Sequence, residues 1–227
     1  MTALVAAIAL CLVLLAGCGG ERERAPSPSP PPGTALVAAA GRGDTATVRR
    51  LLAAGADVDA RDARGRTAVT AAALGEHVEA ARVLIAAGAD VDLQDEERNN
   101  PLLVCGETGN VALLRVVLRA GPDLRRTNRF GGTALIPASD RGHVGVVREL
   151  LRTDIPRDHV NRLGWTALLE AVILGDGGRD HQRIVRMLVG AGADPDRADR
   201  DGVTPLQHAR RRGYTEIARV LEAARRR

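Results

Sequence analysis

Apolar residues recur along this chain with the spacing of short amphipathic helices. Val48, Leu51 and Leu52 fall at positions i, i+3 and i+4, and residues 147–151 repeat the arrangement later in the chain. Residues at this spacing lie on one face of an α-helix, so each segment predicts a helix with a single buried stripe. Other segments are rich in small residues, as at the paired alanines 72–73, which predicts helices that pack closely against a neighbour.

One short signal, a Thr or Asn followed by a small or proline residue and then an apolar residue, occurs six times. The intervals between copies are 33 residues four times and then 38. The copies begin at Thr34, Thr67, Asn100, Thr133, Thr166 and Thr204. A fixed period near 33 residues is typical of a stacked array, in which each unit buries its apolar face only against its neighbours. Function is therefore expected on a surface and not in a deep pocket.

The units carry start and stop signals for their helices. Thr67 stands where a side-chain oxygen caps the first helix of its unit. Between units, residues 62–65 and 199–202 combine Asp with Gly and predict turns. Glycines follow the second helices, where a left-handed residue ends the helix and the missing Cβ removes the steric cost. These glycines are Gly55, Gly88, Gly121 and Gly192.

The order of residues within the unit resembles the ankyrin repeat, whose pattern runs T-P-L-H-x-A-A, then G-H, L-L and G-A-D. The second unit matches it with Thr67-Ala68-Val69, Ala72, His77, Leu84-Ile85 and Gly88-Ala89-Asp90. The resemblance covers residues 34–227 and implies an all-α ankyrin-repeat solenoid of about six helix-turn-helix units with hairpin loops, called fingers below. The units are expected at 34–66, 67–99, 100–132, 133–165, 166–203 and 204–227.

Some units depart from this pattern. The third has Pro122 after its glycine, and the fourth replaces Gly-Ala-Asp by residues 153–156. The fifth carries extra residues around 175–181, which are expected in the turn between its two helices. The last unit has Arg210 and Glu222 where the others have small or aliphatic residues, so it is expected to cap the array.

The first residues of the chain bear on its location. Residues 2–17 are almost entirely apolar and end in Leu15-Ala16-Gly17-Cys18, which resembles the lipobox of bacterial lipoproteins. The resemblance implies a signal peptide at 1–17, a lipid on Cys18, and a protein anchored outside the cytoplasm at the bacterial cell membrane or envelope. Because no Lys or Arg precedes the apolar stretch, an upstream start and an uncleaved membrane helix stay open. Residues 18–33 are polar and proline-rich and predict a flexible linker of ~45 Å when extended.

Composition narrows the classes of partner. The net charge of +4 comes from arginines interleaved with acidic residues, and the chain has no lysine. An exported chain does not meet cytoplasmic nucleic acid, so no nucleic-acid partner is expected, and a monomer is expected. Cys105 stands where other units have alanine, which predicts a buried structural thiol.

The residues that follow the predicted signal peptide contain no G-x-S-x-G, H-E-x-x-H, phosphate-binding glycine loop or Cys-x-x-Cys motif. No enzyme activity and no cofactor are expected. The resemblance implies that His77 and His143 are structural turn residues. One alternative is a metal-dependent hydrolase that uses Asp176, Asp180 and His181 in the fifth unit.

The ankyrin resemblance implies a concave face, made by the fingers and the first helices, that binds another protein. Aromatic residues are favoured at such surfaces. Phe130 and Trp165 lie in adjacent fingers, so a partner-binding patch is hypothesised from these two residues with Arg129 and Arg162. Alternatively, the aromatic residues only cover a neighbouring hairpin. The partner's identity is open, and resemblance to exported bacterial ankyrin proteins suggests a catalase or another envelope stress protein.

Overall fold

The computed structural model describes residues 32–226, so the predicted signal peptide, Cys18 and most of the predicted linker lie outside it. The described residues form twelve helices and no strand. The first helices of the units are α1 (Pro32–Gly41), α3 (Ala68–Leu74), α5 (Pro101–Thr108), α7 (Leu135–Asp140), α9 (Ala167–Ile173) and α11 (Pro205–Arg211). The second helices are α2 (Thr45–Ala53), α4 (Val78–Ala86), α6 (Val111–Arg119), α8 (Val144–Leu150), α10 (Arg179–Gly190) and α12 (Thr215–Ala224).

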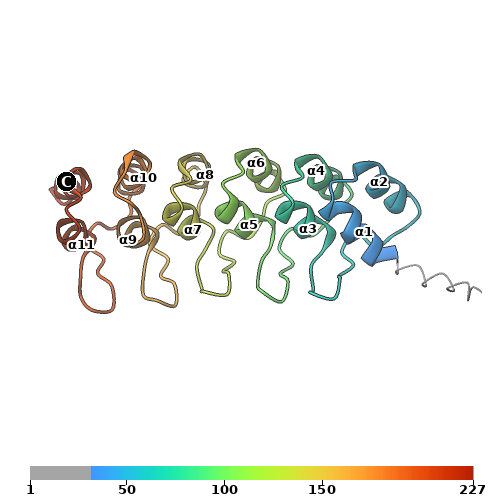
Figure 1. The fold of residues 1–227 in the computed structure, drawn as a ribbon, viewed down its shortest axis with the longest axis horizontal. Helices are drawn as coiled ribbons and strands as arrows, with labels where there is room; N and C mark the ends of the chain where they lie inside the picture. Colours follow the sequence, from blue (N-terminus) through green and yellow to red (C-terminus); the bar gives the residue numbers. More distant parts are fainter. Residues whose placement is uncertain (1–31, 227) are drawn as a thin grey trace, which may run out of the picture.

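Figure 1 shows these helices as two rows, with the first helices in one row and the second helices in the other. The fingers extend from the row of first helices, on the side away from the second helices (Figure 1). Each helix packs on its partner in the unit and on the matching helix of the next unit. The predicted all-α solenoid of helix-turn-helix units is therefore confirmed.

The core that joins the units consists of small and aliphatic side chains. Alanine lies at the same place in the first helix of five units and is fully buried there, at Ala39, Ala72, Ala138, Ala171 and Ala209. Cys105 takes this place in the third unit and is also fully buried, as predicted. Burial raises the pKa of its thiol, because a thiolate is poorly solvated there, so Cys105 acts as a small apolar residue.

The predicted helix starts are confirmed in most units. The Thr67 hydroxyl accepts a hydrogen bond from the Thr70 amide at 3.4 Å, and Asn100 caps α5 in the same way. Thr34 is different because α1 begins at Pro32, before it, so the helix includes the end of the predicted linker. Thr133 does not cap α7, since the Ile136 amide donates to the Thr133 carbonyl instead, at 3.1 Å.

The predicted left-handed glycines are confirmed, because φ is +81° at Gly55, +90° at Gly88, +71° at Gly121 and +95° at Gly192. The fourth unit ends its second helix without a glycine. There the Thr153 hydroxyl donates to the Leu150 carbonyl at 2.6 Å, and the Ile155 amide donates back to that hydroxyl at 3.3 Å. The threonine side chain thus satisfies main-chain groups at the helix end.

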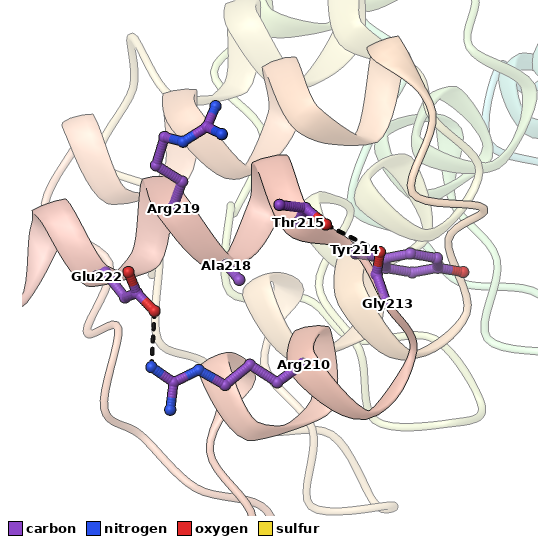
Figure 2. Close-up of a pocket in the computed structure, with 7 residues that line it drawn as sticks. All are labelled: Arg210, Gly213, Tyr214, Thr215, Ala218, Arg219 and Glu222. Atoms are coloured by element: carbon purple, nitrogen blue, oxygen red, sulfur yellow. Dashed lines mark hydrogen bonds and ion pairs between the residues drawn. The ribbon is translucent and has the colours of Figure 1, made fainter.

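The outer face of the last unit is polar. Arg210 on α11 and Glu222 on α12 form an ion pair of 2.7 Å that spans the two helices beside Ala218 (Figure 2). Arg210 is largely exposed and Glu222 is partly exposed, so the pair adds little stability. Its effect is to place charge where the other units have small or aliphatic residues.

Candidate functional site: a pocket between two fingers

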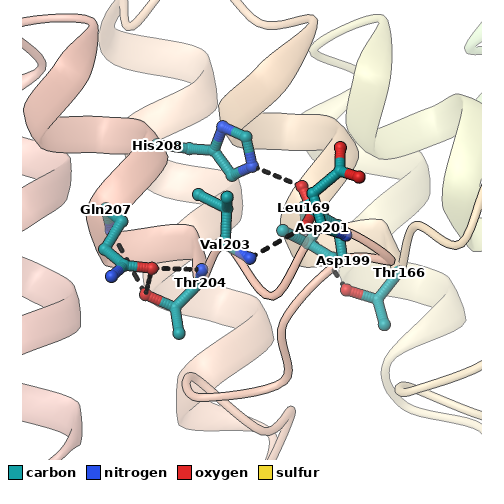
Figure 3. A network of polar contacts seen from close by, with 8 residues as sticks. All are labelled: Thr166, Leu169, Asp199, Asp201, Val203, Thr204, Gln207 and His208. Atoms are coloured by element: carbon teal, nitrogen blue, oxygen red, sulfur yellow. Dashed lines mark hydrogen bonds and ion pairs between the residues drawn. The ribbon is translucent and has the colours of Figure 1, made fainter.

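In each finger, one side chain holds the hairpin. It is an Asn or Asp five residues before the Thr or Asn that begins the next unit. Asn161 accepts hydrogen bonds at Oδ1 from the Leu163 amide at 2.9 Å and from the Trp165 amide at 3.0 Å. Asp199 does the same for Asp201 and Val203, and its other oxygen lies 2.7 Å from His208 Nε2 (Figure 3). A side chain that closes the hairpin from inside fixes the finger.

Burial opposes ionisation of Asp199, but the hydrogen bonds from His208, Val203 and Asp201 outweigh it and lower the pKa of the carboxyl group. Asp199 is therefore ionised at neutral pH and accepts all of these bonds as an anion, which strengthens them.

Neighbouring fingers are joined to each other. The Arg162 amide donates to the Phe130 carbonyl at 2.9 Å, and His159 Nε2 donates to the Gly131 carbonyl at 2.7 Å. Arg129 forms an exposed ion pair with Glu97 of the preceding finger, with 3.0 Å between Nη1 and Oε2. These bonds place the tips of the two fingers side by side. The two fingers, residues 123–132 and 156–165, lead into the fourth and fifth units and are called the fourth and fifth fingers below.

Exposed large apolar side chains gather at this place. Phe130 and Leu163 are the tips of the two fingers, and each is 53% exposed. Leu174, at the end of α9, is 50% exposed. All three line one cavity of about 220 Å³ in the angle between the fingers and the first helices α7 and α9. The fingers and the first helices make up the face on which the sequence predicts binding.

The structure brings together three of the four residues of the hypothesised patch. The Arg129 guanidinium lies 4.9 Å from the centre of the Phe130 ring, which is a cation–π contact. Arg162 lies next to Phe130 because its amide donates a hydrogen bond to the Phe130 carbonyl. Trp165 is half-buried at the base of its finger, where its amide and carbonyl both bond to Asn161, and it does not line the cavity.

Leu163 and Leu174 were not among the predicted residues. Leu163 stands three positions before its repeat Thr, as Phe130 does, so alignment of the fingers contains the signal that identifies it. Leu174 has no such signal, because its exposure depends on where α9 ends.

The cavity also holds a buried carboxyl group. Glu170 on α9 is only 7% exposed, and its Oε1 accepts a hydrogen bond of 2.6 Å from Asn161 Nδ2. Burial raises its pKa to about 7, and the nearby charge of Asp140 adds to the increase, while the bond from Asn161 opposes it. Glu170 could not be identified from the sequence, since its burial follows only from the packing of finger and helix.

The raised pKa predicts a pH-dependent stability. Because the folded chain holds the Glu170 proton more tightly than the unfolded chain, the group stabilises the fold below its ordinary pKa of 4.5, and this contribution is lost as the pH rises through about 7. Glu170→Gln keeps a neutral side chain at every pH. We expect the free energy of unfolding of this variant to exceed that of the parent protein by on the order of 2 kcal/mol at pH 8. At pH 4.5 we expect no difference.

Urea unfolding at both pH values, followed by circular dichroism, measures this effect. Glu96→Gln is the matched control, because Glu96 is an exposed carboxylate in a neighbouring finger. It is expected to leave the pH dependence unchanged. Equal stability of Glu170→Gln and the parent protein at pH 8 would show that Glu170 is ionised at no cost in the fold.

The alternative site in the fifth unit is organised differently from a metal centre. His181 Nδ1 lies 2.8 Å from Asp176 Oδ1, and its Nε2 donates to the Asp140 carbonyl at 2.8 Å. His181 thus has the structural turn position that His143 has in the unit before, where His143 Nε2 donates to the Glu107 carbonyl at 3.0 Å. Asp180 points elsewhere, toward Arg183 at 3.5 Å. Between residues 32 and 226, no group of three or more His, Cys, Asp or Glu is placed to hold a metal ion.

The extra residues of this unit lie in the turn, as predicted, and also lengthen the second helix. The turn holds Asp176, whose pKa is lowered by the hydrogen bond from the Gly178 amide and then by His181. Helix α10 has 12 residues, whereas α4 and α6 have 9. None of the helices from α1 to α12 is both long and apolar enough to cross a membrane.

Comparison with known proteins agrees with this architecture. Residues 3–95, 35–128 and 102–199 match the family described as ankyrin repeats (3 copies). The ankyrin repeat protein YahD of Escherichia coli (strain K12) is 51% identical over 55 residues, which are 24% of this chain and 27% of YahD. The chain thus spans about a quarter of that relative.

Solved structures match over more of the chain. An ankyrin repeat domain from Acinetobacter baumannii AYE is 49% identical, with a TM-score of 0.81 over 83% of this chain and 96% of that one. The ankyrin repeat protein EF0377 is 38% identical, with a TM-score of 0.80 over 84% of this chain and 97% of that one. The ankyrin repeat domain of human ASB11 is 26% identical, with a TM-score of 0.70 over 83% and 82%. The period, the helix pairs, the fingers and these matches together place the chain in the ankyrin-repeat family.

Proposed function

We propose that this protein is a noncatalytic scaffold that binds another protein on its concave face, at the cavity between the fourth and fifth fingers. Within residues 32–226, five large apolar side chains are exposed, and four of them lie between residues 130 and 174. Three of these four line the same cavity. A gathering of exposed apolar side chains costs solubility, and surfaces of this kind usually bind a partner. This observation carries the proposal.

The family supports the same conclusion. Ankyrin-repeat domains are generally protein–protein interaction scaffolds, and the solved relatives share the whole stack of helix pairs and fingers with this chain. The fingers present side chains on a backbone that is fixed by hydrogen bonds between units. A surface prepared in this way loses little conformational entropy when a partner binds.

We also propose that the array is tethered outside the cytoplasmic membrane, through a lipid on Cys18 and the proline-rich linker. The support is the Leu15-Ala16-Gly17-Cys18 sequence and the composition of residues 19–31. In this arrangement the partner is a protein of the bacterial envelope or of the extracytoplasmic space.

The test is affinity capture from membrane extracts of the source organism, followed by mass spectrometry. We expect the parent protein to retain one specific partner and the double variant Phe130→Ser, Leu163→Ser to lose it. Both side chains are half exposed, so the melting temperature is expected to change little.

Leu74→Ser is the matched control. Leu74 is 43% exposed at the end of α3, which belongs to the second unit and is not part of the cavity. This variant is expected to retain the partner. Retention by the double variant, or equal loss from the Leu74 variant, would contradict the proposed location of the binding surface.

A further inference from the structure

The cavity between the fourth and fifth fingers is acidic, although the chain as a whole is basic. Its lining includes three carboxyl groups, Glu107 on α5, Asp140 on α7 and Glu170 on α9. Arg141 is the one cationic side chain in the lining. The formal charge of the whole chain is +4. The negative charge is therefore a local property of this cavity.

Several acidic side chains of the described residues form ion pairs, but these three carboxyl groups do not. Elsewhere, acidic side chains pair with nearby cations, as Glu149 does with Arg115 at 2.7 Å and Glu216 with Arg186 at 2.8 Å. In the ion pairs formed among residues 32–226, neither Glu107, Asp140 nor Glu170 takes part.

Of the three carboxyl groups, Glu170 is the most deeply buried. It is more than nine-tenths buried, it lines the cavity, and its carboxyl group has a single hydrogen bond, from the neutral amide of Asn161. A buried carboxylate with one neutral donor lacks most of the solvation that it has in water. A cation that enters the cavity restores this solvation and gains a charge-assisted hydrogen bond.

The rest of the lining fits the apolar stem of a basic side chain. Phe130, Leu163 and Leu174 surround the acidic groups with exposed apolar surface. Arginine and lysine combine a charged head with an aliphatic stem that packs on such surface. A free metal ion gains no stabilisation from contact with the apolar rim. The carboxyl groups of the cavity repel an acidic partner.

We propose that the cavity binds the cationic side chain of an arginine or lysine in an extended segment of the partner protein. The head lies beside Glu170 and Asp140, and the aliphatic stem packs between Phe130 and Leu163. This inference rests on the proposed function, because it names the chemistry of the partner at the same surface.

The charge state of the cavity makes the binding depend on pH. The pKa of Glu170 is about 7, and burial raises the pKa of Asp140 as well, although Arg141, His181 and His143 oppose that increase. Glu170 is ionised above pH 7 and becomes neutral below it. Binding of a cation is therefore expected to strengthen as the pH rises from 6 to 8, and the bound cation lowers the pKa of Glu170 by linkage.

The test uses the full-length chain in detergent and two synthetic peptides, acetyl-Ala-Leu-Arg-Leu-Ala-amide and the same peptide with citrulline in place of arginine. Citrulline has nearly the shape of arginine but no charge. NMR titrations follow the side-chain amide of Asn161 and the carboxyl carbon of Glu170. We expect the arginine peptide to bind roughly tenfold more tightly than the citrulline peptide at pH 8, with a smaller difference at pH 6.

Glu170→Gln is the matched variant, and it is expected to fold at least as stably as the parent protein. It is expected to remove most of the preference for arginine while leaving the citrulline peptide unaffected. Equal binding of the two peptides by the parent protein would overturn the inference and leave the apolar docking surface intact. Failure of both peptides to bind at millimolar concentration would also overturn it. Failure of the proposed function appears separately, as retention of the partner by the Phe130 and Leu163 double variant.

Discussion

Replacing Gly106 by alanine is expected to destabilise the array by about 2–4 kcal/mol. Gly106 lies in α5 at the contact with α7, and a Cβ atom there meets the Ala134 carbonyl oxygen at 2.5 Å and the Ala134 Cα at 3.1 Å. These are backbone atoms, so no side-chain rotation relieves the overlap. The third and fourth units must separate, and this weakens the contacts between neighbouring repeats on which a repeat array depends. Urea unfolding of the variant measures the loss.

Gly190→Ala is the control and is expected to have the opposite sign. Gly190 is the last residue of α10, and nothing lies within 4 Å of an added Cβ. Alanine favours the helical backbone over glycine, so a gain of about 0.5 kcal/mol is expected. If Gly106→Ala is as stable as the parent protein, then the close approach of α5 and α7 is not a constraint on the stack.

Replacing Cys18 by serine is expected to move the protein from the membrane fraction to the soluble fraction. In the proposed anchor, several acyl chains are attached at this residue, and each buried CH₂ contributes ~0.8 kcal/mol to membrane binding. Serine has no thiol that could form the thioether to the lipid. The anchor is therefore expected to be lost completely. Cell fractionation and mass spectrometry of the mature N-terminus measure both consequences.

Cys11→Ser is the matched control, because Cys11 lies within the predicted signal peptide and is expected to be removed with it. This variant is expected to stay in the membrane fraction with the normal lipid mass. A Cys18→Ser protein that remains in the membrane, with the first residues still attached, would support an uncleaved membrane helix and contradict the lipid anchor.

Most of the fold could be predicted because the information is local and repeated. A glycine such as Gly88 and a cap such as Thr67 act on residues within one turn of the chain, and the period of 33 residues adds the order of the units. The exceptions arise where a different hydrogen bond replaces the one that the local sequence predicts. Thr133 has the sequence of a cap, but a backbone carbonyl takes the amide that its side chain would bind.

The candidate site could be predicted only in part. Phe130 and Arg129 were identified because aromatic and arginine side chains are common at interfaces, and the structure places them together. Trp165 is of the same chemical type, but it lies at the base of the hairpin, where most of its surface is covered. Residue type indicated the region, whereas exposure depended on the position within the finger.

The acidic centre of the cavity could not be predicted from residue type. Glu170 is an ordinary surface residue by composition, and the positions that match it in earlier units hold Ala71, Val104 and Pro137. Its burial requires the finger that contains Asn161 to fold back against α9. This burial raises its pKa, and Asp140 from the previous unit adds to the increase. These contacts join residues from different units and exist only after the units stack.

Site-specific photo-crosslinking in living cells tests whether the partner binds at the cavity between the fourth and fifth fingers. A photo-reactive phenylalanine analogue is placed at Leu163, a rim residue of the cavity, or at Arg82, an exposed residue of α4 in the row of second helices. We expect one crosslinked protein from position 163 and none from position 82. A crosslink from position 82 alone would contradict binding at the cavity.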